Sequence, residues 1–244
     1  MFNLSVKNTA LLFLTLPILG FSSTSLKDNQ SFSKTKKVLL KQVYYDHKET
    51  FYCQVPFEVK QVKGKEKAVV NPIQDGFHYR KNETRASRIE WEHIMPAENF
   101  GRQLACWYKG DSQCIDSAGK SYKGRKCCEK TSKQFRLMQA DPYNLVPAIG
   151  EVNGDRSNYR FADTNSKLTG QYGKCAFKVD FKERKAYPAD YTKGFIGRAY
   201  LYMADTYKLK LSKQDRQLME DWANKYPISD WEKTRKQRID RLMR

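Results

Sequence analysis

Histidine is scarce in this sequence. The 244 residues hold three, His47, His78 and His93. None lies in an H-E-x-x-H pattern, the helical signature of many zinc proteases, so the sequence disfavours a metalloprotease. The six cysteines include no C-x-x-C pair and their spacings fit no common zinc finger, which leaves a zinc site only as a minor alternative. A site that uses imidazole chemistry therefore has few candidates.

A long apolar run is also missing. Residues 10–21 are apolar, but a membrane-spanning helix needs about 20 such residues. Lys7 precedes this run and small residues follow it at 22–25, so we predict a signal peptide at residues 1–23, with an uncleaved anchor as the alternative. No linker or internal repeat divides the rest of the chain. We expect a flexible lead-in at 24–33 and one folded domain at 34–244.

Acidic residues are too few to balance the basic ones. Lys and Arg number 45 against 27 Asp and Glu, which gives a formal net charge of +18. A surface of this kind suits a polyanionic partner such as nucleic acid, but it also suits an anionic membrane or cell-wall surface. The charge alone does not imply catalysis.

Cysteine occurs in an even number in a chain that carries an export signal. This combination predicts disulfide bonds in an oxidising compartment, most simply three of them. Six cysteines allow 15 pairings, and the sequence does not choose among them. The residues are Cys53, Cys106, Cys114, Cys127, Cys128 and Cys175.

The stretch 88–102 concentrates ionisable groups within an apolar run, and we interpret it as the catalytic centre. Glu92 and His93 together can hold a metal ion and move a proton, and Arg88 and Arg102 can hold an anion beside them. In a regular strand Glu92 and His93 would point to opposite faces, so they serve one site only if the strand ends or bends. Pro96 is consistent with such an ending. The alternative is an edge strand with solvated glutamates.

A second informative stretch covers residues 141–160. Asn153-Gly154 would ordinarily signal a hairpin turn, and Asn158 could cap a helix. The other interpretation is a short strand at 144–147 that leads into a helix near 150–158. In that case Asn153 projects its amide oxygen back toward Glu92 and His93.

Elsewhere the patterns predict mainly scaffold. We expect helices at 34–45, 194–208, 212–225 and 229–243, a β-rich segment at 50–55, a strand or loop at 57–70, and a hairpin from strands at 176–181 and 186–187. Ser212 and Ser229 are expected N-caps, and the basic end of the last helix is expected to be a solvated face. Asn82-Glu83-Thr84 matches a glycosylation acceptor. Residues 106–134 are rich in Cys and Lys and predict a disulfide-stapled surface loop whose lysines contact phosphates.

Taken together, the exported cysteine-bearing chain and the motifs at 90–97, 100–101 and 144–158 closely resemble the endonuclease I family of periplasmic or secreted, sequence-non-specific nucleases. The resemblance implies an α+β fold, a mixed single domain with a ββα-metal (His-Me finger) catalytic core, surrounding helices and the disulfide-stapled loop. It implies that His93 is the general base and that Glu92 and Asn153 bind a divalent ion, usually Mg²⁺, with Mn²⁺ or Ca²⁺ as other choices. Arg125 matches the phosphate-binding arginine of the family.

The sequence departs from the family pattern at two places. Gln139 stands where the family usually has an acidic residue and cannot supply a charge, and Val55 and Pro56 replace a second cysteine that often follows the one matching Cys53.

The resemblance implies that the substrate is DNA, with RNA left open, and that the products carry 5′-phosphates. We expect a monomer with no membrane contact after signal cleavage. A non-catalytic extracellular DNA-binding protein on the same fold is the alternative. The residues expected to contact nucleic acid are Arg102, Lys123, Lys126 and Arg156.

Overall fold

Two antiparallel strands from distant parts of the chain form the centre of the fold. The computed structural model describes residues 25–164 and 167–244, so the predicted signal peptide at 1–23 lies outside the described residues. β5 (Ile89–His93) pairs with β6 (Leu145–Ile149), with Glu92 opposite Val146 and His93 opposite Leu145. Every residue of β6 is buried, which explains its apolar run.

A helix follows β6 directly. α7 (Gly150–Arg156) contains Asn153 and Gly154, so the hairpin-turn interpretation of this dipeptide is wrong and the strand-to-helix interpretation is confirmed. The structure gives another reason for the glycine. A Cβ at Gly154 would lie 2.0 Å from the guanidinium of Arg85, so the glycine allows the close approach of that side chain.

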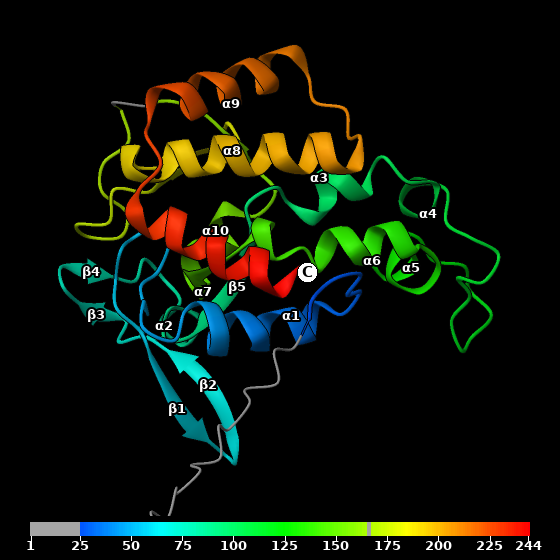
Figure 1. Ribbon diagram of the computed structural model, residues 1–244, viewed down its shortest axis with the longest axis horizontal. Helices are drawn as coiled ribbons and strands as arrows, with labels where there is room; N and C mark the ends of the chain where they lie inside the picture. The colour runs from blue at the N-terminus through cyan, green and yellow to red at the C-terminus, as the bar shows by residue number, and fades with distance from the viewer. Residues whose placement is uncertain (1–24, 165–166) are drawn as a thin grey trace, which may run out of the picture.

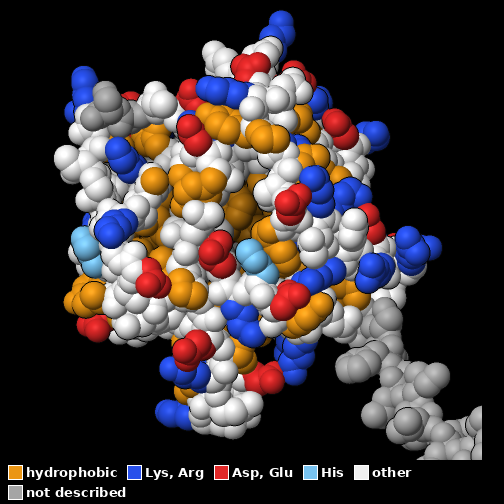
Figure 2. Space-filling view, turned by 60° about the vertical axis from the view of Figure 1, so that its left-hand side comes forward, with side chains coloured by type: hydrophobic (Ala, Val, Ile, Leu, Met, Phe, Trp, Pro, Cys, Tyr) orange, Lys and Arg blue, Asp and Glu red, His pale blue; other side chains and the backbone are white. Residues whose placement is uncertain are grey.

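Within residues 25–164 and 167–244, three further small sheets surround this ribbon. β1 (Glu58–Val62) and β2 (Lys65–Val69) form a hairpin that projects from the body at the bottom of the views in Figure 1 and Figure 2. Residues 57–70, which were expected to form a strand or a loop, therefore contain a hairpin. The expected hairpin near 176–187 is confirmed. The remaining strands are β3 (Ile73–Gln74) with β4 (Phe77–His78), and β7 (Arg160–Phe161), β9 (Lys185–Tyr187) and β8 (Lys178–Asp180) in that spatial order.

The β-rich prediction for residues 50–55 is wrong, because this segment is a series of turns. Thr50 Oγ1 accepts a hydrogen bond from the Val55 amide, and Gln54 has a φ of 52°. The turn buries the Tyr52 side chain, which is 1% exposed. Tertiary burial and a local turn therefore override the β-propensity of the sequence.

Three long helices cover one side of the molecule. α8 (Asp190–Tyr207) and α9 (Lys213–Lys225) lie side by side at the top of Figure 1, and α10 (Asp230–Leu242) crosses its middle. Ser212 and Ser229 accept hydrogen bonds from backbone amides at the starts of α9 and α10, as predicted. The shorter helices are α1 (Phe32–Val38), a π-helical turn (Leu39–Val43), α2 (Glu83–Ala86), α3 (Ala97–Gly101), α4 (Ala105–Tyr108), α5 (Arg125–Thr131), α6 (Lys133–Gln139) and a 3-10 turn (Pro142–Asn144).

Both ends of the described chain pack together. Leu26 belongs to the segment expected to be a flexible lead-in, but it is 2% exposed and its amide donates to the Leu242 carbonyl. Arg235 corrects the expectation of a solvated basic face on α10. Its guanidinium is buried and donates to the Tyr44 hydroxyl and to the carbonyl of Leu145. This arginine ties α10 to the start of β6.

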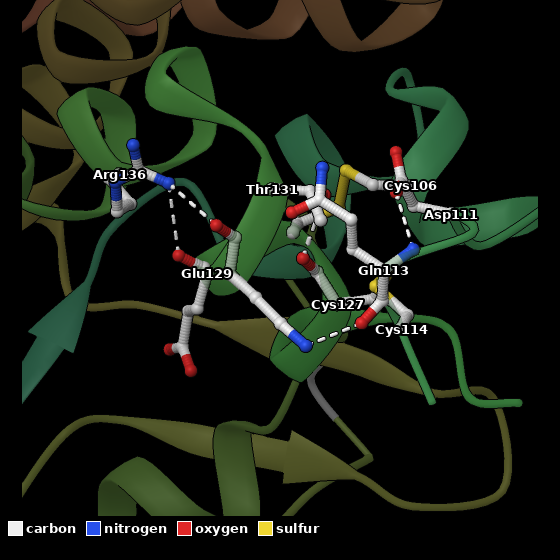
Figure 3. Close-up of a disulfide and its surroundings, with 10 residues drawn as sticks. Cys106, Asp111, Gln113, Cys114, Cys127, Glu129, Thr131 and Arg136 are labelled. Atoms are coloured by element: carbon white, nitrogen blue, oxygen red, sulfur yellow. Dashed lines mark hydrogen bonds between the residues drawn. A yellow bond between two sulfur atoms is a disulfide. The ribbon is translucent and has the colours of Figure 1, made fainter. Parts of the chain in front are cut away.

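Three disulfides form, as expected, and they confirm an even pairing of all six cysteines. Cys53 joins Cys175, Cys106 joins Cys128, and Cys114 joins Cys127. Figure 3 shows the second and third bridges beside the 109–124 segment. The stapled-loop prediction holds for that segment. It is wrong at the two ends of 106–134, where residues 106–108 belong to α4, residues 125–131 form α5 with both adjacent cysteines buried, and residues 133–134 begin α6. The protein is therefore a mixed α+β domain with small sheets and three disulfides.

Candidate active site

The residues singled out in the two sequence motifs line one cleft. Its volume is about 330 Å³, and β5, α7, α5 and α1 all contribute to its wall. Glu92 and His93 are consecutive residues of β5, so strand alternation directs their side chains to opposite sides. Both line the cleft because the strand ends at His93. The predicted site residues found there are Glu92, His93, Arg125, Asn153 and Arg156.

The His93 ring has a defined orientation. Its Nε2 lies 2.9 Å from the backbone carbonyl oxygen of Gln139, and its ring centroid lies 4.8 Å from that of Phe32. A carbonyl can only accept a hydrogen bond, so Nε2 carries the proton of the neutral ring and Nδ1 is the basic nitrogen. Burial lowers the pKa of His93 to about 3, so the ring is neutral at neutral pH. A neutral, oriented imidazole is the form that can take a proton.

Gln139 contacts both His93 and Arg125. The bond to His93 uses the backbone carbonyl, which any residue supplies. The side-chain Oε1 of Gln139 is 3.3 Å from Nη2 of Arg125. The neutral amide of Gln139 thus helps to hold the Arg125 guanidinium beside the imidazole.

Arg125 lies at the start of α5, with Gly124 at the N-cap. Gly124 has a φ of 82°, a conformation that favours glycine, and it brings the following arginine to the cleft. The guanidinium also pairs with Glu129 at 3.1 Å, and its side chain is 43% exposed. An exposed cation beside His93 suits an anionic phosphate.

Glu92 is held on one of its two oxygens. Oε1 accepts a hydrogen bond from the Tyr52 hydroxyl at 2.8 Å and lies 3.1 Å from Nη1 of Arg156. Burial raises the pKa of Glu92 to about 7, while the Arg156 guanidinium acts in the opposite direction. Because Oε1 receives both contacts, Oε2 is the oxygen best placed to bind a cation.

Asn153 is oriented by a carboxylate. Its Nδ2 donates to Glu90 Oε2 at 2.8 Å, and Glu90 is in turn held by Arg85 and Arg88. Since a carboxylate accepts but does not donate, the amide must present its NH₂ group to Glu90. The Oδ1 atom of Asn153 is therefore turned away from Glu90 and is available as an oxygen ligand.

Arg156 does not occupy a surface position, which corrects its expected role as a nucleic-acid contact. It is 0% exposed, and it donates to the backbone carbonyls of His93 and Ile94 as well as pairing with Glu92. One guanidinium thus holds three consecutive residues at the end of β5. The reason is that the end of α7 packs against the end of β5, where free carbonyls need donors.

The other expected nucleic-acid contacts lie outside the cleft. Lys123 and Lys126 are exposed near its Arg125 side. Arg102 is also exposed and pairs with Glu98, and it lines a separate depression together with Arg160 and Arg184. Sequence reasoning missed Tyr52, Arg85 and Phe32. No local pattern marks them, because each reaches the site through tertiary packing.

Comparison with known proteins gives this arrangement a family. The model of the Endonuclease I family matches residues 24–244. A periplasmic deoxyribonuclease of Aeromonas hydrophila is 43% identical over 95% of this chain and 90% of its own length. The chain belongs to the endonuclease I family. An extracellular deoxyribonuclease of the same organism is also 43% identical, over 95% and 93% of the two chains, and Endonuclease-1 of Buchnera aphidicola subsp. Baizongia pistaciae is 40% identical over 84% and 76%.

The cleft of this endonuclease I chain can be tested for its fit to the divalent ion implied by the resemblance. Among residues 25–164 and 167–244, no group of three or more His, Cys, Asp and Glu side chains is placed to hold a metal. The donors at the cleft are instead one carboxylate, Glu92, and one amide oxygen, Asn153. Two hard oxygen ligands suit Mg²⁺, which keeps several waters and binds substrate phosphate. The residues fit such an ion, and they do not fit a closed zinc site.

The described part of this chain contains no membrane-spanning helix. None of the helices formed by residues 25–164 and 167–244 is long and apolar enough to cross a bilayer.

Proposed function

We propose that this protein is a periplasmic or secreted, divalent-metal-dependent endonuclease that hydrolyses DNA without sequence preference and leaves 5′-phosphates. The catalytic core is the ββα-metal unit formed by β5, β6 and α7. The observation that carries the proposal is the convergence of an oriented neutral imidazole, two hard oxygen donors and an exposed arginine on one cleft. The names of the similar deoxyribonucleases support the substrate.

His93 performs the first proton transfer. Its Nδ1 takes a proton from a water molecule while the water oxygen forms a bond to phosphorus. The bond between phosphorus and the 3′-oxygen breaks, so the phosphate stays on the 5′-oxygen of the next nucleotide. The leaving 3′-oxygen takes a proton from solvent, and His93 returns its proton to solvent. A positioned general base typically contributes about 10²–10⁴-fold to the rate. The Gln139 carbonyl keeps Nε2 protonated, so that Nδ1 remains the base.

Arg125 and the oxygen donors stabilise the charge of the reacting phosphate. The Arg125 guanidinium offers hydrogen bonds to its non-bridging oxygens. Glu92 and Asn153 would hold the divalent ion, which when bound supplies neutralisation of the phosphate and of the leaving oxygen. Glu90 and Arg156 act on these ligands by fixing the Asn153 amide and the end of β5.

Sequence preference is expected to be weak. The cleft is polar and its walls offer contacts to phosphate rather than a shape for one base. Contacts to the phosphate backbone position a protein on DNA but carry no sequence information directly. RNA also carries this backbone, so RNA remains a second proposed substrate.

The test uses oxidised protein without residues 1–23, incubated with plasmid DNA and total RNA in Mg²⁺ or in EDTA. The expected result is Mg²⁺-dependent cutting of DNA into fragments whose ends ligate without prior phosphorylation, because 5′-phosphates are present. A protein that shifts DNA in a gel in either buffer but never cuts it would instead support the alternative, a non-catalytic DNA-binding protein.

A further inference from the structure

The β1–β2 hairpin carries lysines that the cleft does not use. Lys60 is directly opposite Lys67, and Lys65 is directly opposite Val62. Opposite residues of an antiparallel pair share a face, so the three lysines project from one face of the hairpin. Lys63 occupies the turn. All four side chains are exposed, and Figure 2 shows Lys and Arg side chains on the lobe at the bottom, where Figure 1 places the hairpin.

The acidic residues of the hairpin do not neutralise this face. Glu66 pairs with Lys41, at 2.7 Å, and Glu58 pairs with Lys60, at 2.9 Å. Within the described part of the chain, Lys63, Lys65 and Lys67 form no ion pair. Like charges directly opposite destabilise an antiparallel pair, and a two-stranded ribbon is marginal on its own. The hairpin therefore carries positive charge that folding does not require.

The register joins the base of this lysine face to the strand that carries the catalytic residues. Val69 at the base of β2 forms a bridge with Arg88, just before β5. Val69 shares the hairpin face with Lys67 and Lys65, and Arg88 shares a face of its strand with Glu90, to which it is paired. The lysine face therefore continues onto the Glu90 face of β5.

The direction of β2 can also be related to that of β5. β2 and the start of β5 are antiparallel at this bridge. The path along β2 from Val69 toward Lys65 therefore has the same direction as the path along β5 from Arg88 toward His93. The pairing ends after this bridge and the hairpin leaves the body (Figure 1). Its lysines thus lie on an arm whose base is joined to the strand that leads to the catalytic residues.

We propose that the β1–β2 hairpin is a binding arm that holds the phosphate backbone of duplex DNA beside the cleft. This inference rests on the proposed function, because it assigns a second contact to the same substrate. The arm increases affinity for long duplexes and takes no part in the chemical step. A Lys at each position supplies a point charge to phosphate without reading the bases.

The test compares two triple variants of equal charge. The arm variant is Lys63→Gln, Lys65→Gln, Lys67→Gln, and the control is Lys208→Gln, Lys210→Gln, Lys213→Gln near the connection of α8 and α9, which Figure 1 shows far from the hairpin. Binding to a 30-base-pair duplex is measured in EDTA from 50 to 200 mM salt. Each lost phosphate contact lowers the slope of log K against log salt by about 0.9.

If three phosphate contacts are lost, the loss of affinity between 50 and 200 mM salt should be about 40-fold larger for the wild type than for the arm variant. The control should keep the wild-type slope. With Mg²⁺, the arm variant should have a raised KM for plasmid but an unchanged kcat, and its melting temperature should not fall. Equal slopes for the arm variant and the control would overturn the proposal. Absence of cutting by the wild type would count against the proposed function alone, because the binding measurement needs no cleavage.

Discussion

Replacing Arg156 by methionine should strongly destabilise the protein. The change removes the ion pair with Glu92 and the hydrogen bonds to the carbonyls of His93 and Ile94, all of them buried. Breaking a buried ion pair by removal of one partner costs about 3–5 kcal/mol, because the other charge remains uncompensated. We therefore expect the free energy of unfolding of Arg156→Met to fall by about that amount.

The assay is urea unfolding of the oxidised protein in EDTA, with Arg102→Met as the control. The Arg102 side chain is 69% exposed and makes a surface pair with Glu98, so its removal should change stability by less than about 1 kcal/mol. A double variant with Glu92→Gln should lose at least about 1 kcal/mol less than the sum of the two single variants, because the two residues interact directly.

The competing interpretation is that Arg156 contacts phosphate, as the sequence alone suggested. It predicts nearly wild-type stability for Arg156→Met and a smaller salt dependence of DNA binding. That pair of results would refute the role assigned to Arg156 by the structure.

Two further predictions concern residues around the site and in the scaffold. Glu90→Leu removes the acceptor that orients the Asn153 amide, so Mg²⁺ affinity measured by calorimetry should fall about tenfold or more, whereas Glu83→Leu on the exposed side of α2 should leave it unchanged. Asp163→Asn should cost about 1 kcal/mol at pH 7, because the Lys193 ammonium holds the pKa of Asp163 below its usual value. A lowered pKa in the folded state stabilises the protein fully above the unfolded-state pKa near 4, and this stabilisation is lost as the pH falls through the lowered folded-state pKa, so the difference between the two proteins should shrink progressively below pH 4. A difference in stability that stays constant as the pH is lowered from 7 through 4 to 2 would contradict the assignment.

The local sequence predicted the elements that local rules control. Alternation along 88–95 and the following Pro96 indicated that a strand ends near His93, and the apolar run before Gly150 indicated that a strand leads into a helix. Ser212 and Ser229 marked two helix starts, because a capping hydroxyl needs only the amide three residues later.

Tertiary contacts decided the rest. The burial of Arg156 depends on carbonyls at the end of β5, more than 60 positions earlier in the chain, so a polar side chain that local rules place on the surface becomes internal. The contact of Gln139 with His93 uses a backbone carbonyl, which leaves no trace in residue identity. The pairing of Cys106 with Cys128 likewise follows from the packing of α4 against α5, which the spacing of the cysteines does not encode.

The most direct test of the account is the rate of plasmid cleavage in Mg²⁺ by the wild type, His93→Ala and His78→Ala. His78 is an exposed histidine on β4 and provides a matched control. The account predicts that His93→Ala loses at least about 100-fold in rate, the lower range for a general base, while binding DNA as before, and that His78→Ala stays at the wild-type rate. Cleavage by His93→Ala at the wild-type rate would contradict the assignment of His93 as the base.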